Sequence, residues 1–158
     1  MSKLLELRPY QAEIGRAILD SVLHGRGRAF TVEIARQGGK NELSAQLEML
    51  LMALFSVKGG NLIKAAPTFD PQARISISRL KERMRDAGLG GLWRTEAGGA
   101  IRLGRARQMF LSAEPSSNVV GATAHILLEV DEAQDVDREK FYKEFRPMGA
   151  STNVTTAL

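Results

Sequence analysis

Lys40 follows two glycines in a short turn, and this arrangement is suited to holding phosphate. Residues 35–41 read ARQGGKN, between a segment rich in β-forming residues and one with the composition of a helix. The N–H groups of such a turn surround phosphate oxygens, the helix start adds a partial positive charge, and lysine adds a full one. The pattern predicts a polyphosphate site at residues 36–41. An ordinary glycine turn with a solvated Lys40 is the alternative.

Two adjacent acids, Asp131 and Glu132, end a strongly apolar segment. Residues 126–130 read ILLEV, and such a segment is typical of a buried strand whose carboxyl end faces the ligand crevice of a parallel sheet. Phosphoryl transfer requires one carboxylate near magnesium and another that orients or deprotonates the attacking water. Asp131 suits the first role and Glu132 the second, and a solvated turn is the alternative. Glu129 is unexpected inside the strand, unless it has a polar partner or an incompletely covered sheet face.

The turn departs from the phosphate-loop pattern G-x-x-x-x-G-K-[ST] at two positions. Gly39 and Lys40 match, whereas Ile34 occupies the first glycine position and Asn41 replaces the magnesium-binding hydroxyl. Asn41 would therefore have to reach magnesium through its side-chain carbonyl or through a water molecule.

The elements that must position these residues alternate between strand and helix. Helices are expected over residues 10–23, 42–57 and 138–145, and a further helix after Asp70, with Asp70 as its cap and Pro71 at its first position. Strands are expected over residues 28–34, 61–66, 124–130 and 153–158. Short β-like pieces at residues 93–96, 100–103 and 108–112 indicate a small antiparallel insertion. The alternation predicts an α/β fold of the P-loop NTPase type, with a mainly parallel sheet flanked by helices.

The composition is that of one globular domain over residues 1–158. Hydrophobic residues make up 44% of the chain and charged residues 25%. There is no cysteine, which excludes disulfides and thiolate metal sites. The net charge of +4 is compatible with a phosphate-rich partner but does not select one. No apolar segment is long enough to cross a bilayer, so no membrane association is expected.

Taken together, the segments resemble the N-terminal ATPase domain of phage large terminases, the motors that package DNA. The matching segments are residues 7–11, 35–40, 66–70, 121–123, 131–134 and 155–156. The resemblance implies ATP and Mg²⁺ as ligands, double-stranded DNA as substrate, and the portal and small terminase subunit as partners. It also implies a ring of identical chains in the host cytoplasm, and a longer protein whose nuclease domain is absent here. The strand around residues 153–157 would lie between those leading to Lys40 and Asp131.

The resemblance also implies roles for individual residues. The nucleotide-binding set would be Arg8, Tyr10, Gln11, Arg36, Gln37, Gly38, Gly39, Lys40 and Asn41. Within it, Tyr10 and Gln11 would contact adenine, and Arg36 would act on the phosphates of its own chain as a catalytic residue alongside Lys40 and Glu132. Thr155 and Thr156 would sense hydrolysis and relay it to DNA. The alternatives are a core aromatic for Tyr10 and ordinary strand residues for the two threonines.

Two other functions remain open from the sequence. Residues 8–11 and 131–134 also resemble motifs in the first lobe of superfamily 2 helicases, and a non-catalytic nucleotide-binding module is a further alternative. The helix after Asp70 carries five basic residues outside its apolar stripe, which favours either a solvated face or contact with DNA phosphates. They are Arg74, Arg79, Lys81, Arg83 and Arg85.

Overall fold

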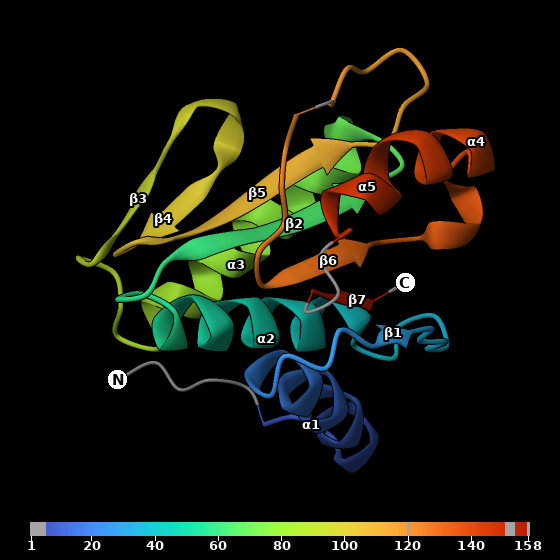
Figure 1. Cartoon of the computed structure of the whole chain (residues 1–158). Coiled ribbons are helices and arrows are strands. Elements are labelled where there is room, and N and C mark those ends of the chain that lie inside the picture. Colours follow the sequence, from blue (N-terminus) through green and yellow to red (C-terminus); the bar gives the residue numbers. More distant parts are fainter. Residues whose placement is uncertain (1–5, 120, 151–153, 158) are drawn as a thin grey trace.

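The computed structural model describes residues 6–119, 121–150 and 154–157, which form a seven-stranded sheet with helices on both faces (Figure 1). The strands are β1 (Ala29–Phe30), β2 (Gly60–Ala66), β3 (Trp93–Thr95), β4 (Ile101–Leu103), β5 (Ala106–Ser112), β6 (Leu127–Val130) and β7 (Thr155–Ala157). The long helices are α1 (Pro9–Leu23), α2 (Lys40–Leu54) and α3 (Arg74–Asp86). The short helical segments are η1 (Phe69–Ala73), η2 (Ala97–Gly99), η3 (Ala133–Asp135), α4 (Arg138–Lys140), η4 (Phe141–Phe145) and α5 (Arg146–Met148).

The sheet is parallel at its centre and antiparallel at one end. Its strand order is β1-β7-β6-β2-β5-β4-β3. The five neighbours β1, β7, β6, β2 and β5 are paired in parallel, and β4 and β3 are added antiparallel at the β5 edge. This confirms the predicted α/β fold, and β3 and β4 form the predicted antiparallel part. The prediction was wrong for residues 108–112, which belong to β5 and pair in parallel with β2 in the main sheet. Strand β7 lies between β1 and β6, as the resemblance to terminases implies.

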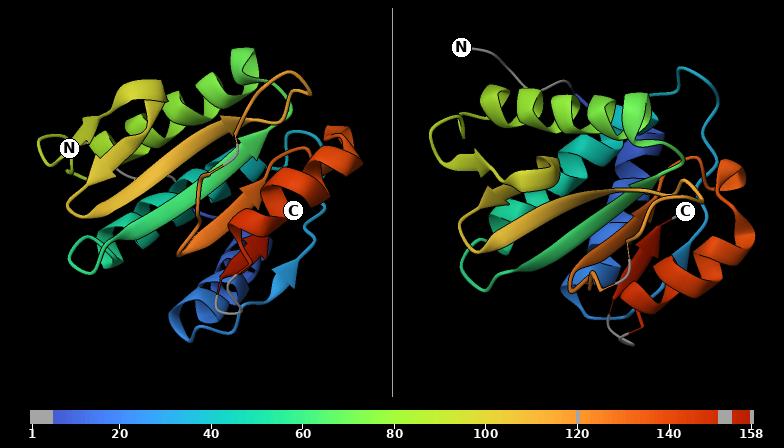
Figure 2. Two further views of the ribbon diagram at one scale, coloured as in Figure 1. Left: turned by 45° about the horizontal axis from the view of Figure 1, so that its top comes forward. Right: turned by 90° about the horizontal axis from the view of Figure 1, so that it is seen from above.

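Both faces of the central strands are covered, which explains their nearly continuous apolar sequence. Helices α1, α2 and α3 pack on one face, and the segment from α4 to α5 packs on the other (Figure 2). Leu62 and Leu127 belong to the core on the first face, whereas their neighbours Ile63 and Leu128 belong to the core on the second. Alternate side chains thus enter different cores, as expected for a sheet buried on both sides.

Strand β1 is much shorter than the predicted strand over residues 28–34. Only Ala29 and Phe30 pair with β7, opposite Thr156 and Ala157. Residues 31–34 continue toward the glycine turn without a ladder. The prediction was wrong here because β-forming composition alone does not supply a partner strand.

Two helix starts also differ from the prediction. Helix α2 begins at Lys40 rather than at residue 42, because Gly39 has a left-handed φ of 83° and serves as its N-cap. Helix α3 is regular from Arg74 onward, after η1, and the Asp70 backbone is extended (φ −105°, ψ 121°) directly before Pro71, as at the predicted cap position. The Asp70 carboxylate pairs with Arg74 Nε at 2.5 Å. Helix α2 ends at Leu54, three residues before the predicted end, where a turn leads to Gly59.

Candidate functional site: a phosphate loop facing two acids

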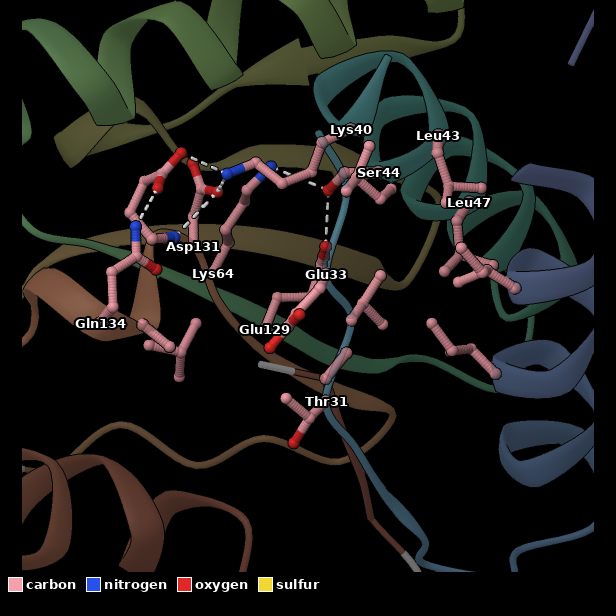
Figure 3. Close-up of a pocket in the computed structure, with 18 residues that line it drawn as sticks. Thr31, Glu33, Lys40, Leu43, Ser44, Leu47, Lys64, Glu129, Asp131 and Gln134 are labelled. Carbon is pink, nitrogen blue, oxygen red and sulfur yellow. Dashed lines mark hydrogen bonds and ion pairs between the residues drawn. The ribbon is translucent and has the colours of Figure 1, made fainter. Parts of the chain in front are cut away.

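The structure brings Lys40 together with both predicted acids. The Lys40 ammonium lies 2.9 Å from Asp131 Oδ1 and also donates to Glu132 Oε1. Lys40 begins α2 after the glycine turn, and the acids directly follow β6. Both elements follow parallel strands, so their side chains meet at the carboxyl edge of the sheet. Figure 3 shows Lys40 and Asp131 directed toward each other, with Gln134 beside them.

The turn from residue 35 to residue 41 forms a loop with a large pocket beside it. Gln37 and Gly39 both have left-handed backbone, with φ of 61° and 83°, and the Gly38 N–H donates to the Ala35 carbonyl at 2.8 Å. A pocket of about 1120 Å³ is lined by residues 32–42 together with Arg79, Glu132, Gln134 and Asp135. The first amides of a helix have no intrahelical acceptor, so those at the start of α2 are available to an anion.

Lys40 and Glu132 shift each other's pKa values at this edge of the sheet. Partial burial opposes the charge of Lys40, but the hydrogen bonds to Glu132 and Asp131 outweigh it and raise the lysine pKa. The hydrogen bonds from Lys40 and Gln134 lower the pKa of Glu132, and Arg36 adds to this effect. Glu132 is therefore a carboxylate at neutral pH, which is the protonation state that a water-orienting group needs. Its backbone is left-handed, with φ of 48° and ψ of 50°, which is uncommon outside glycine.

Arg36 and Asn41 both line the loop pocket. Arg36 is exposed on the loop, and Asn41 lies in the first turn of α2. Asp131 and Asn41 each offer an oxygen ligand of the kind that magnesium uses, since it binds proteins through one or two carboxylates and otherwise keeps water and substrate phosphate. No group of three or more His, Cys, Asp or Glu side chains within the described ranges is arranged to hold a metal. Asp131 and Asn41 are too few to bind a metal ion without other ligands, but they suit an ion that arrives bound to a nucleotide.

Arg8, Tyr10 and Gln11 lie against the same loop. The Tyr10 hydroxyl donates to the Gly38 carbonyl, and Arg8 Nη1 donates to the Tyr10 oxygen at 3.3 Å. Gln11 Nε2 donates to the Gly39 carbonyl at 2.9 Å. These side chains are therefore close to the predicted nucleotide site, and contact with adenine stays a prediction.

Thr155 and Thr156 lie deeper in the sheet than the acids. They pair with Leu127 and Leu128, at the start of β6, whereas Asp131 follows the end of that strand. The Thr155 hydroxyl is fully buried and hydrogen-bonds that of Ser21 in α1 at 2.8 Å. Neither threonine lines the loop pocket, so their proposed coupling role stays a prediction that would have to act through α1 or β6.

A buried polar cluster lies beneath the site, and the sequence reasoning did not find it. Lys64 Nζ donates to Glu48 Oε1 at 3.2 Å and to Ser44 Oγ at 2.8 Å, and Ser44 lies 2.5 Å from Glu129 Oε2. This arrangement, visible in Figure 3 for Lys64, Ser44 and Glu129, supplies the polar partner that Glu129 requires. The cluster lines a second cavity, of about 420 Å³, that also reaches Lys40, Asp131 and Glu132. Residues 31–34, which lack a strand partner, form one wall of that cavity.

A charge pattern in the sequence points to this cluster. Lys64 and Glu129 each interrupt an otherwise apolar strand, and they are directly paired in register between β2 and β6. Charged side chains inside two buried strands would rarely be tolerated without polar partners nearby. The helix partners Ser44 and Glu48 carry no comparable signal, because polar residues are common on helices.

The basic residues of α3 do not form one free face. Arg83 is buried and pairs with Asp86 at 2.9 Å and with Glu42 of α2 at 3.6 Å. Arg79 also pairs with Glu42, and Arg74 pairs with Asp70. Lys81 and Arg85 lie over the ring of Trp93. The prediction that all five lie outside the packed side was therefore wrong for Arg83, which joins α3 to α2.

Comparisons with known proteins give the fold a precedent. Over 97% of its length the chain is similar to the large terminase of bacteriophage HK97, with a TM-score of 0.74 and 21% identity. It is similar over 96% of its length to the ADP complex of the large terminase of the thermophilic bacteriophage D6E (TM-score 0.70, 16% identity). It also matches the ATPase domain of the Thermus phage P74-26 large terminase over 96% of its length, with a TM-score of 0.63 and 20% identity. The chain thus has the fold of a large-terminase ATPase domain, which is a P-loop NTPase fold.

The extent of these matches differs between the proteins. The chain spans 33% of the HK97 protein, 38% of the D6E protein and 70% of the P74-26 domain. No protein-family model matches the chain, and no curated protein sequence matches it either. Among the described residues, no helix has the length and apolar character needed to cross a membrane.

Proposed function

We propose that the chain is the ATP-hydrolysing motor domain of a phage large terminase, which drives double-stranded DNA into procapsids. The observation that carries the proposal is the meeting of Lys40 with Asp131 and Glu132 at the carboxyl edge of a terminase-like sheet. A phosphate-gripping lysine and two acids are the groups that phosphoryl transfer from ATP to water requires. The likeness to large terminases favours this role over a helicase lobe. ATP is proposed as the nucleotide, with ADP in the D6E structure as support.

In the proposed mechanism, the loop binds the phosphates and the acids prepare the attack. The amides of residues 36–41 and the ammonium of Lys40 hold the β- and γ-phosphates, and Arg36 stabilises their charge from the same chain. Glu132 orients the attacking water and accepts its proton. Asp131 would hold Mg²⁺, with Asn41 contributing through its side-chain oxygen or a water, and the ion would neutralise phosphate charge. Thr155 and Thr156 are proposed to relay hydrolysis toward DNA.

The partners belong to the same proposal. The chain would work in a ring of identical copies in the host cytoplasm, with the portal and the small terminase subunit, on double-stranded DNA. In this architecture the half-buried Lys81 and the exposed Arg85 of α3 are more available to DNA phosphates than the buried Arg83.

Lys40→Ala tests the site directly. The substitution removes the full charge that faces both acids, so we expect binding of MgATP to be abolished, as measured by isothermal titration calorimetry. Lys143→Ala, which removes an exposed lysine far from the loop pocket, serves as the control. Affinity and ATP turnover equal to those of the parent chain in Lys40→Ala would refute the assignment. Stimulation of turnover by double-stranded DNA would distinguish a motor from a passive nucleotide-binding module.

A further inference from the structure

Tyr10 and Gln11, at the start of α1, hydrogen-bond two successive carbonyls of the phosphate loop. The Tyr10 hydroxyl donates to Gly38 O, and Gln11 Nε2 donates to Gly39 O at 2.9 Å. Gln11 is only 4% exposed, and its remaining polar atom, Oε1, accepts from the Arg8 backbone N at 2.8 Å. Both polar ends of the Gln11 side chain are therefore bound by the protein itself.

These two carbonyls determine the direction of the N–H groups that follow them. In a trans peptide the C=O of one residue and the N–H of the next point in opposite directions. Because Gly38 O and Gly39 O are directed toward α1, the N–H groups of Gly39 and Lys40 are directed away from it. Those two amides belong to the segment that lines the loop pocket. Holding the carbonyls thus keeps the amides oriented for an anion before it binds.

The close approach of Gln11 requires glycine at position 39. A Cβ added there would come within 2.3 Å of Gln11 Nε2, and the φ of 83° would strain any other residue. The Gly39 carbonyl also accepts the first helical hydrogen bond of α2, from Leu43 N at 3.0 Å. One carbonyl therefore joins α1, the loop and α2.

We infer that Tyr10 and Gln11 are positioning residues that hold the phosphate loop in its binding conformation. They contribute to nucleotide affinity through the phosphates and not through recognition of the base. The inference rests on the proposed function, since it assigns these residues within the same site.

Recognition of the base, orientation of the loop amides and a purely structural role affect different measured quantities. A residue that reads the base changes the preference for ATP over GTP and leaves binding of inorganic tripolyphosphate unchanged. A residue that orients loop amides changes the affinity for all three ligands by the same factor. A residue with only a structural role would lower the unfolding temperature without any effect on the affinity of the folded chain.

Tyr10→Phe and Gln11→Glu isolate the contacts with the loop. The first removes only the hydroxyl, and the second keeps an oxygen for Arg8 N but replaces the donor to Gly39 O with a second oxygen. Tyr142→Phe, at an exposed tyrosine, and Gln72→Glu are matched controls. The Gln72 oxygen accepts from Thr68, a contact that glutamate retains. Affinities for MgATP, MgGTP and magnesium tripolyphosphate would be measured by calorimetry, with thermal unfolding of each variant by circular dichroism.

We expect Tyr10→Phe to lose about three- to tenfold in affinity, equally for the three ligands, as the loss of one hydrogen bond predicts. Gln11→Glu should lose more, because its buried carboxylate faces the Gly39 carbonyl. The controls should bind like the parent chain. If Gln11→Glu does not fold, Tyr10→Phe tests the inference alone. A loss confined to MgATP, or unchanged affinity for all three ligands in both variants, would overturn it. A parent chain that binds none of the three would contradict the proposed function itself, and the inference would fall with it.

Discussion

Lys40 balances two carboxylates that would otherwise repel each other and any polyphosphate beside them. Its ammonium contacts Asp131 and Glu132, and these contacts raise the lysine pKa, so the side chain stays cationic. A nucleotide at the loop would have to share this one charge with the acids. In the proposed mechanism a divalent cation would supply further positive charge, because a single ammonium does not neutralise two carboxylates and a triphosphate together.

Substitution of Glu132 separates binding from hydrolysis. Glu132→Gln keeps the size of the side chain and leaves Asp131 with Lys40, so we expect MgATP binding to persist. The amide cannot accept a proton from water, and we expect single-turnover hydrolysis to fall by about 10²- to 10⁴-fold. Calorimetry and a quenched assay with radiolabelled ATP would measure the two effects.

Glu139→Gln is the matched control for that substitution. Glu139 is an exposed acid of α4 outside the loop pocket, and its neutralisation should change neither binding nor hydrolysis. Loss of binding in Glu132→Gln together with preserved turnover would mean that Asp131 and Glu132 have exchanged the roles assigned to them.

The central residues of the site could be predicted from the sequence because their signals are local. Gly39 and Lys40 lie in one turn, and Asp131 and Glu132 end one apolar strand. The contacts of Gln11 could not be predicted in this way. Its donor reaches a carbonyl 28 positions away, and only the packing of α1 beside the loop brings the two together.

At the scale of elements, the polar cluster joins α2 to two central strands. Burial and the nearby Glu48 raise the pKa of Glu129 well above its ordinary value. Burial opposes the charge of Lys64, but Glu48, Glu129 and Asp131 outweigh it and raise the lysine pKa. Within the cluster, Lys64 forms an ion pair with Glu48 at 3.2 Å. A buried charge is tolerated where it is paired in this way.

Removal of the cation should therefore be costly. Lys64→Met leaves the Glu48 carboxylate buried without its partner, and we expect the free energy of unfolding to fall by about 3–5 kcal/mol. Adding Glu48→Gln to Lys64→Met restores neutrality, so the double variant should recover part of this loss. Urea unfolding followed by circular dichroism would give all values of the cycle.

Lys58→Met controls for the loss of a lysine as such. Lys58 is exposed in the turn after α2, and its substitution should change stability by less than about 0.5 kcal/mol. Equal stability of Lys64→Met and Lys58→Met, or a double variant no more stable than Lys64→Met, would show that the cluster is not held by charge balance.

The elements that the sequence predicts best are those whose pattern is complete within the element. The strand around residues 61–66 and the two short strands near residues 93–96 and 100–103 were confirmed nearly to the residue. The piece at residues 108–112 was wrongly assigned to the antiparallel insertion, because its pairing with β2 is not visible in its own sequence. The predicted strand over residues 28–34 was too long, because its ladder depends on β7, more than 120 residues later. The regular part of α3 starts at Arg74, later than predicted, because the irregular segment η1 precedes it.

At the scale of the molecule, the site joins parts of the chain that follow strands which are not neighbours in the sheet. The loop and α1 lie at the β1 end of the sheet, whereas the acids follow β6, and β7 separates the two strands (Figure 1). The strand order could be anticipated only from the resemblance to terminases, because periodicity does not specify which strands are neighbours. A ligand held by both the loop and the acids would therefore tie two regions of the fold together.

This arrangement predicts that MgATP stabilises the whole molecule. A ligand that binds only the folded state adds about 2.7 kcal/mol at a concentration one hundred times its Kd. For a chain of this length, that corresponds to an increase of about 5–10 °C in Tm. We expect this increase with MgATP, a smaller one with ATP and EDTA, because the acids then face phosphate without a cation, and none in Lys40→Ala. Glu132→Gln should retain the full increase, since it loses only the group that prepares the water.

Scanning fluorimetry over a series of nucleotide concentrations would measure these shifts. An equal increase with MgATP and with ATP in EDTA would contradict the role of Asp131 as the magnesium ligand, and an increase retained in Lys40→Ala would move the nucleotide away from the loop.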